Sequence, residues 1–348
     1  MNTSADLAPT LARARALPKV LLHEHLDGGL RVATLLELLH QRSLASPAPD
    51  APTLAAWFDA NAQAGSLVKY LEGFALTVSA MGTPAALERV AFEAAEDALA
   101  DGAVLAEFRI APLLFEPYGI SGEEAVEALL AGLARSVLPS GLIVCGMRQL
   151  PPDEVMDAAR LALAYQDRGV VAFDLAGPEI GHPPGQHAQA LALVRAAGMP
   201  LTLHAGEADC AERVLEAGRL GARRIGPGVR LVDALLDPAQ APLIDEARAF
   251  GLHLEVCPTS NVHTGAATSV ATHPITALWR AGLSLSYHTD NRLISCITQS
   301  GEAAALLADT PLTEADLLAM ALQAAQHSFM PEAVRLRAQE RISGWTVA

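Results

Sequence analysis

The sequence lacks the features that mark a membrane protein or a disulfide-rich secreted protein. Its 348 residues include no apolar run near the roughly 20 residues that cross a bilayer, so no membrane partner is expected. The N-terminal segment 1–16 has no hydrophobic signal core, which predicts a cytoplasmic protein. Cysteines are few and scattered, which argues against a disulfide framework and against a cysteine zinc site (Cys145, Cys210, Cys257 and Cys296).

Basic residues are also scarce. The chain has 24 Lys and Arg against 39 Asp and Glu, a net charge of −15, and no long basic run. A field of that sign repels phosphate backbones, so nucleic acid is not an expected partner. Apolar residues make up 51% of the chain and charged residues only 18%, which permits a large buried core. Because single α/β barrels often reach this length, we expect one domain over residues 1–348.

The chain lacks a Gly-x-Gly-x-x-Gly after its first apolar run, which disfavours the main alternative, an open doubly wound sheet. Eight short apolar runs rich in Val, Ile and Leu alternate instead with helical patterns such as residues 153–166. The runs cover residues 19–25, 104–110, 142–147, 170–175, 200–204, 224–228, 252–257 and 283–290. Repeated strand–helix alternation predicts a (β/α)8 barrel of the TIM type.

Two regions exceed a minimal barrel. Helical patterns flank the proline-rich segment 46–52, and Thr83-Pro84 has the form of a helix start. An insertion after the first strand lies over the mouth of a barrel, so residues of about 30–100 are expected to form a helical lid. Residues 311–341 are expected to be helical as well.

The first run contains an alternating polar pattern. In an extended strand the side chains of His23, His25 and Asp27 point to the same side. Two imidazoles on one face form half of a tetrahedral metal site. The alternative is a pair of half-buried histidines bonded to the backbone.

Further polar residues end other runs. His204 ends the fifth run and Asp290 the eighth, so a barrel would bring both to the face where His23 and His25 lie. Three imidazoles and a carboxylate suit Zn²⁺, which can keep an open position for water. Glu207, three residues past His204, could then carry protons. The alternative is four unrelated polar residues that cap strand ends.

Seven segments in order resemble the adenosine deaminase family of the amidohydrolase superfamily over nearly the whole chain. They lie at residues 23–29, 107–112, 174–179, 204–207, 257–261, 264–266 and 289–291. The resemblance implies a barrel with one zinc ion bound by His23, His25, His204 and Asp290. It also implies that hydroxide generated at the zinc attacks purine C6, with Asp290 and Glu207 as catalytic residues, Glu207 protonating N1 and ammonia leaving.

The same resemblance implies a substrate site. Gly177 would donate its backbone N–H to purine N3, Asn291 would contact N7, and His25 would border the substrate. Asp27 favours a nucleoside, because its counterpart in adenosine-type enzymes contacts the ribose. Tyr70 and Phe74 match aromatic residues of the pocket wall, although both could equally be core residues of the lid.

Three positions depart from the family pattern, and at one of them, Asn291, many relatives have a second Asp, although asparagine can still bond to N7. Pro227 stands where the family has a histidine that orients the hydroxide, and proline has no ionisable group. Such a group is typically worth about 10²–10⁴ in rate, so a slower or re-tuned enzyme is expected. His288 stands where relatives usually have asparagine; it could compensate as a catalytic residue, or it could be a buried histidine bonded to its neighbours.

Three functions remain open from the sequence. The first is a zinc-dependent aminohydrolase that converts adenosine or deoxyadenosine to inosine or deoxyinosine. The second is a catalytically degenerate protein that binds purine nucleosides. The third is a zinc aminohydrolase for another modified purine. The sequence does not predict the oligomeric state.

Overall fold

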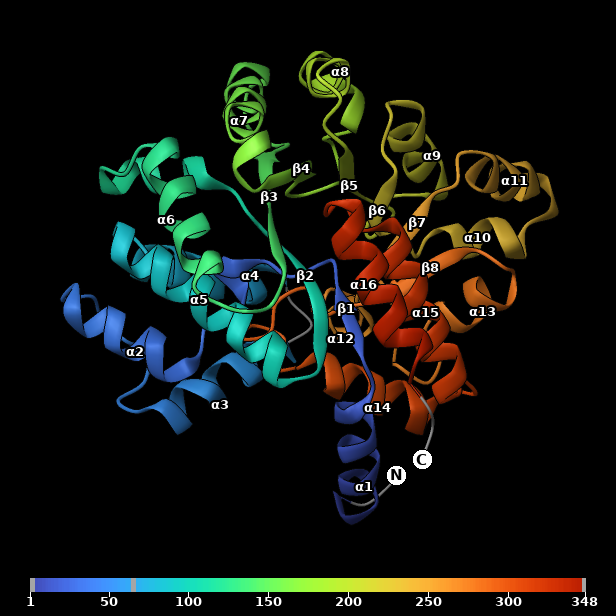
Figure 1. Ribbon diagram of the computed structural model, residues 1–348, viewed down its shortest axis with the longest axis horizontal. Coiled ribbons are helices and arrows are strands. Elements are labelled where there is room, and N and C mark those ends of the chain that lie inside the picture. Colours follow the sequence, from blue (N-terminus) through green and yellow to red (C-terminus); the bar gives the residue numbers. More distant parts are fainter. Residues whose placement is uncertain (1–3, 64–66, 346–348) are drawn as a thin grey trace.

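The computed structural model describes residues 4–63 and 67–345, and the side chains of residues 10–63 and 72–345. Eight parallel strands form one sheet in sequential order, curled into a (β/α)8 barrel (Figure 1). The strands are β1 (Lys19–Leu21), β2 (Ala103–Ile110), β3 (Ser140–Met147), β4 (Val170–Ala176), β5 (Leu201–Ala205), β6 (Arg224–Pro227), β7 (His253–Val256) and β8 (Ser284–Tyr287). The predicted barrel is confirmed, and the sequential order excludes the doubly wound alternative, in which strand order reverses.

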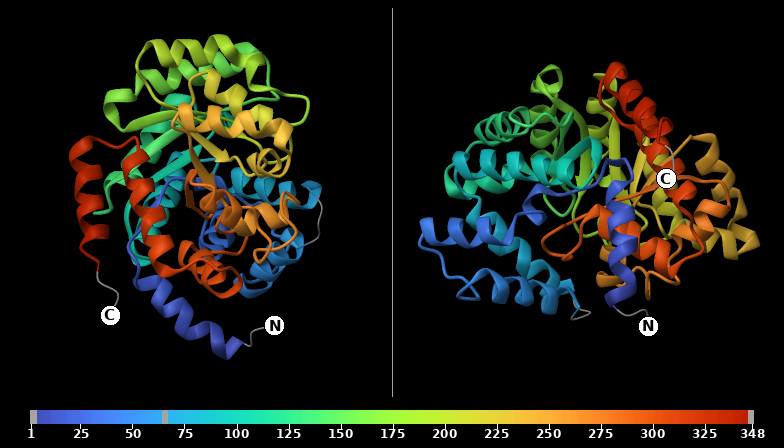
Figure 2. Two further views of the ribbon diagram at one scale, coloured as in Figure 1. Left: turned by 90° about the vertical axis from the view of Figure 1, so that its right-hand side faces the viewer. Right: turned by 60° about the horizontal axis from the view of Figure 1, so that its bottom comes forward.

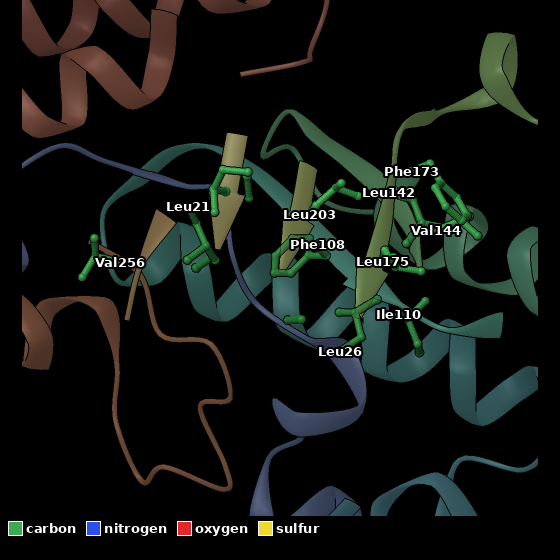
Figure 3. Close-up of a cluster of buried hydrophobic side chains, with 14 of the residues drawn as sticks. Leu21, Leu26, Phe108, Ile110, Leu142, Val144, Phe173, Leu175, Leu203 and Val256 are labelled. Atoms are coloured by element: carbon green, nitrogen blue, oxygen red, sulfur yellow. The ribbon is translucent and has the colours of Figure 1, made fainter. Parts of the chain in front are cut away.

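The strands are buried on both faces. All residues of β2 are buried, and most of those of β3 and β4 as well. Figure 3 shows side chains of this core from neighbouring strands, among them Phe108, Val144, Phe173 and Leu203. Helices cover the outer faces, so outward side chains are buried as well as inward ones.

The first and last strands are shorter than predicted. Strand β1 ends at Leu21 and β8 ends at Tyr287, so His23 and Asp290 follow their strands rather than end them. Chain segments beyond the strands still meet, because His25 N–H donates to Asp290 O at 2.8 Å and Asp290 N–H to His23 O at 3.1 Å. The two-residue alternation stops at His25. The prediction of one extended stretch through Asp27 is wrong, because Asp27 lies in the 3₁₀ helix η1 (Leu26–Gly28).

Helices form an arc around the strands (Figure 1). They are α5 (Pro84–Ala100), α6 (Gly122–Ala134), α7 (Pro152–Ala164), α8 (Ala188–Ala196), α9 (Ala211–Arg219), α10 (Leu231–Leu236), α11 (Ala241–Ala249) and α13 (Ile275–Arg280). Four short 3₁₀ helices join them: η2 (Pro112–Tyr118), η3 (Gln166–Arg168), η4 (Pro184–His187) and η5 (Pro238–Gln240). Helix α7 confirms the pattern at residues 153–166. A short helix, α12 (Pro258–His263), follows β7 directly and lies inside the arc.

The insertion after β1 is helical, as predicted. It contains α2 (Val32–Gln41), α3 (Ala51–Ala62) and α4 (Leu67–Ala80), which lie together to one side in both views of Figure 2. Thr83 caps α5 through a bond from Ala86 N–H, which confirms the predicted helix start. The proline-rich segment contains a second helix cap: Asp50 accepts from Thr53 N–H, and α3 begins at Ala51.

The C-terminal part is helical from α14 (Gln299–Asp309) through α15 (Glu314–His327) to α16 (Glu332–Ser343). Helix α15 packs on β1 and β8, α16 packs on β2, and α1 (Ser4–Ala16) lies against α14. Within the described residues no helix is both long enough and apolar enough to span a bilayer.

Candidate metal centre and catalytic site

Four side chains from three parts of the barrel meet at one point. His23 and His25 follow β1, His204 lies in β5, and Asp290 follows β8. One ligand atom from each of these residues lies within 4.8 Å of the others, and no other such group occurs among the described residues. His23 is buried, and the other three side chains are partly exposed. The structure therefore brings together the whole predicted ligand set.

The spacing within this cluster matches a tetrahedral metal site. His25 Nε2 lies 3.2 Å from His204 Nε2, and Asp290 Oδ1 lies 3.3 Å from His23 Nε2 and 3.5 Å from His25 Nε2. Bonds of about 2.0–2.1 Å in tetrahedral directions separate neighbouring donor atoms by about 3.3–3.4 Å. Burial lowers the pKa of His25 and of His204, which favours the neutral imidazole that a metal requires. The residues present fit a metal ion of the size of zinc.

Two buried carboxylates hold two of these histidines from behind. Glu255 in β7 lies 2.8 Å from His23 Nδ1, and Asp174 in β4 lies 2.9 Å from His204 Nδ1. Each bond places the ring proton on Nδ1 and leaves Nε2 as a lone-pair donor toward the cluster. Both side chains are fully buried.

Arg109 in β2 joins the two carboxylates. Its Nη1 donates to Asp174 at 2.7 Å and its Nη2 to Glu255 at 2.5 Å. Arg224 in β6 pairs with Glu255 as well, and its charge and that of Arg109 hold the pKa of Glu255 well below its usual range in spite of burial. Sequence reasoning missed this network. Its signal was present: charged residues interrupt apolar runs at positions that are buried in a parallel sheet.

Glu207 lies on the loop after β5 and is half-buried beside the cluster. Two residues near α12 contact its carboxylate: Thr264 Oγ1 donates to Oε1 at 2.9 Å, and Asn261 Nδ2 lies 3.5 Å away. Burial raises the pKa of Glu207 to about 7, and the negative charge of Asp290 adds to the rise. Near neutral pH this carboxyl group therefore exchanges a proton readily. The same helix supplies Ser260, whose hydroxyl donates to Asp290 Oδ2 at 2.6 Å.

Of the predicted substrate residues, Asp27 and Phe74 lie close to residues of the cluster. Asp27 is buried in η1, where burial and then Asp290 raise the pKa of its carboxyl group to about 7. The Phe74 ring of α4 stands edge-on to the His25 ring, with centroids 6.5 Å apart. Gly177 follows β4 directly, and Asn291 lies against Gly28 of η1. The side chain of Tyr70 lies outside the described residues.

Pro227 is the last residue of β6 and pairs in register with Ala205. The residue before it, Gly226, faces His23: a Cβ at Gly226 would lie 2.4 Å from His23 Cε1. The His23 ring therefore fits against the barrel wall only because residue 226 has no side chain. Pro227 brings no ionisable group to the place where the resemblance implied one.

His288 is engaged elsewhere. Leu22 N–H donates to His288 Nδ1 at 3.1 Å, and Nε2 lies 2.7 Å from Ser286 Oγ. Since Nδ1 accepts, the ring proton is on Nε2 and is donated to the serine. Burial lowers the pKa of this histidine well below its ordinary value. The bond from Leu22 links the segment after β1 to the segment after β8, and the two bonds together leave neither ring nitrogen for the cluster, which favours a structural role over the predicted catalytic one.

A barrel with a histidine–carboxylate cluster at the C-terminal ends of its strands, next to a glutamate of raised pKa, has the features of a metal-dependent hydrolase. Comparison with known proteins identifies the family. The family model for adenosine deaminase matches residues 18–345, so the chain belongs to the adenosine deaminase family. It is an aminohydrolase.

Individual relatives agree. The chain is 40% identical over 348 residues to the adenosine deaminase of Mycobacterium tuberculosis, a match that covers 94% of each chain. It is 42% identical over 310 residues to the adenosine deaminase of Mycobacterium marinum, covering 84% of this chain and 85% of the relative.

Solved structures share the fold. A zinc-bound amidohydrolase from Burkholderia ambifaria superposes with a TM-score of 0.82 at 25% identity and covers 99% of this chain and 93% of its own. An N6-mAMP deaminase from Arabidopsis has a TM-score of 0.83 at 24% identity, with coverage of 95% and 99%. This second likeness concerns the fold alone.

Proposed function

We propose that this protein hydrolyses the 6-amino group of a purine nucleoside, and converts adenosine or deoxyadenosine to inosine or deoxyinosine and ammonia. One observation carries the proposal: a complete His23–His25–His204–Asp290 cluster lies beside a glutamate, Glu207, whose pKa is raised to about 7. Relatives at 40% identity over nearly the whole chain are adenosine deaminases, which supports the substrate.

The donor set and its spacing fit a zinc ion held by the three imidazoles and Asp290. When bound, zinc lowers the pKa of water and so supplies hydroxide at neutral pH. The Glu255 and Asp174 carboxylates keep His23 and His204 in the tautomer that exposes Nε2. Ser260 fixes Asp290 by its bond to Oδ2 and leaves Oδ1 directed at the histidines.

Glu207 holds the proton that the reaction needs. Protonation of purine N1 by this carboxyl group makes C6 more electrophilic, oxygen adds at C6, and the bond from C6 to the amino nitrogen breaks. One proton of the added water restores the Glu207 carboxyl group, and the other passes to the amino nitrogen, which leaves as ammonia while the C6 carbonyl forms. A pKa of about 7 lets Glu207 give its proton and recover it at neutral pH.

The substrate would lie between the cluster and the lid formed by α2, α3 and α4. We assign purine contacts to Gly177 and Asn291 and the ribose contact to Asp27. The buried Asp27 carboxyl group, close to the charge of Asp290, suits a neutral ribose hydroxyl. A 5′-phosphate would add negative charge to these acids. Phe74, which lies against His25, would form the apolar wall, and Tyr70 stays a prediction on the same helix.

Pro227 favours a second candidate, a family member that binds purine nucleosides without turnover. The ligand cluster and Glu207 are complete, however, and they supply hydroxide and proton independently of residue 227. We therefore propose an active enzyme whose rate is lower than that of relatives with a histidine at this position.

The test is turnover by zinc-loaded protein. Adenosine, deoxyadenosine, adenosine monophosphate, its N6-methyl derivative and adenine are each assayed by ammonia release, with Glu207→Gln as the matched variant. Glu207→Gln is expected to slow turnover on the order of 10²–10⁴-fold. Preference for adenosine or deoxyadenosine supports the proposal. Preference for a nucleotide or for adenine contradicts the proposed substrate. Nucleoside binding without ammonia from any compound supports the non-catalytic candidate.

A further inference from the structure

The loop that bears Glu207 is tied to a second glutamate. Glu179 Oε1 accepts from Gly206 N–H at 2.6 Å, and Oε2 accepts from the N–H groups of Glu207, Ala208 and Asp209 at 3.1, 2.8 and 2.9 Å. One carboxylate thus satisfies four consecutive backbone donors. Glu179 is itself buried, with 7% of its surface exposed.

The local sequence makes this arrangement possible. Gly206 has φ of +67°, a left-handed conformation that turns its N–H and those that follow toward one point. A side chain there would also collide with Val214, since a Cβ would lie 2.4 Å from its Cγ2. The turn after His204 therefore forms a concave row of donors, and the loop after β4 inserts Glu179 into it.

A buried arginine holds the same loop from the other side. Arg148, directly after β3, donates through Nη2 to the carbonyl oxygens of His204 and Leu175, the latter at 2.7 Å. The peptide group after the ligand His204 is thereby fixed to the end of β4. Charged groups on both sides of residues 204–209 restrain the backbone, and such charge-assisted bonds are about twice as strong as neutral ones.

We propose that Glu179, assisted by Arg148, is a positioning residue for the general acid: it fixes the backbone from which Glu207 reaches the purine. The inference rests on the proposed function, because it concerns the same site. The Glu179 side chain makes no hydrogen bond to the cluster or to the Glu207 carboxyl group within the part of the chain that the structure describes, so its bonds act through the main chain, while its negative charge adds to the rise in the pKa of Glu207.

The central variant is Glu179→Gln, in which an NH₂ group replaces one acceptor and faces backbone donors. A displacement of about 1 Å at a catalytic group costs about 10²-fold in rate, so kcat for adenosine is expected to fall about 10²-fold while KM changes less than about threefold. The matched control is Glu124→Gln. Glu124 also accepts from a backbone N–H, that of Ser121, but in the exposed first turn of α6, and its loss should leave kcat unchanged.

A double-mutant cycle separates positioning from general structural support. If Glu179 acts through Glu207, then Glu179→Gln changes residual kcat by less than about threefold in a Glu207→Gln background. A second loss of about 10²-fold in that background would overturn the proposal.

Amide hydrogen exchange supplies a readout that needs no activity. In Glu179→Gln the amides of Gly206 to Asp209 are expected to exchange at least about tenfold faster, with strands such as β2 and β3 unchanged. Faster exchange throughout the barrel, or unchanged exchange of this loop, contradicts the inference. If wild-type protein deaminates no purine, the proposed function fails, while exchange still reports whether Glu179 holds the loop.

Discussion

Replacement of Glu255 by glutamine tests whether the buried carboxylate network holds the metal ligands. Glu255 Oε2 accepts from His23 Nδ1 and Arg109 Nη2, and Oε1 lies 3.0 Å from the Thr202 hydroxyl and 2.5 Å from Arg224 Nε. In Glu255→Gln one carboxylate oxygen becomes an NH₂ group, so either His23 and Arg109 or Thr202 and Arg224 face a donor instead of an acceptor. The two buried guanidinium groups also lose the negative charge that they share.

Two losses follow from this geometry. Loss of a carboxylate behind a ligating histidine typically costs 10- to 100-fold in metal affinity, or about 1.4–2.7 kcal/mol. Removal of one partner from a buried ion pair costs about 3–5 kcal/mol of folding free energy. We therefore expect Glu255→Gln to bind Zn²⁺ 10- to 100-fold more weakly and to unfold at lower denaturant concentration.

The matched control is Glu107→Gln. Glu107 in β2 is equally buried and also pairs with Arg224, at 2.7 Å, but its hydrogen bonds go to Ser328 and to Phe329 N–H and not to a histidine. It should lose stability and keep its zinc affinity within about threefold. Affinity is measured by competition with a chromophoric chelator on folded protein. Wild-type affinity in Glu255→Gln, or equal weakening in both variants, would refute the reasoning.

Three further results are expected. Pro227→His should raise kcat about 10²–10⁴-fold, whereas Pro227→Ala should not, and turnover of adenosine by both variants decides whether residue 227 limits the rate. Phe74→Ala should raise KM about 2- to 10-fold with a smaller change in kcat, since an aromatic contact is worth about 0.5–1.5 kcal/mol; an unchanged KM would remove Phe74 from the pocket. Glu302 is a buried residue of α14 that accepts from Thr259 N–H, and Glu302→Gln should increase stability at high pH. Burial raises the pKa of Glu302 to about 8 from 4.5, so the native state binds this proton more tightly than the unfolded state, and the wild type loses stability between about pH 4.5 and 8. Thermal unfolding should show the variant more stable by a few kcal/mol at pH 9 and equal at pH 4; equal stability at both pH values would contradict the shifted pKa.

The sequence by itself determined the barrel and the ligand set. Runs of Val, Ile and Leu separated by amphipathic patterns encode strands covered on both faces, and parallel strands in sequential order place all their C-terminal ends on one side. For this reason His23, His25, His204 and Asp290 could be assigned to one site although 267 positions separate the first from the last.

Local sequence rules failed where contacts between distant segments decide the backbone. The pairing of His23 and His25 with Asp290 ends the regular strands early, and η1 takes Asp27 out of the alternation. The outcome for His288 has the same origin in part, because its bond from Leu22 N–H exists only where the segment after β8 lies beside the segment after β1, whereas its bond to Ser286 is local.

Only the tertiary structure revealed what supports the site. Asp174, Glu255 and Arg109 come from three separate strands, and Glu179 reaches the Glu207 loop from the loop that follows β4. A sequence shows that a charged residue interrupts an apolar run, but the partner that makes its burial tolerable is set by packing. The placement of polar residues at and just beyond the strand ends determined which residues form the ligand cluster, and long-range pairing of buried charges decided how they are held there.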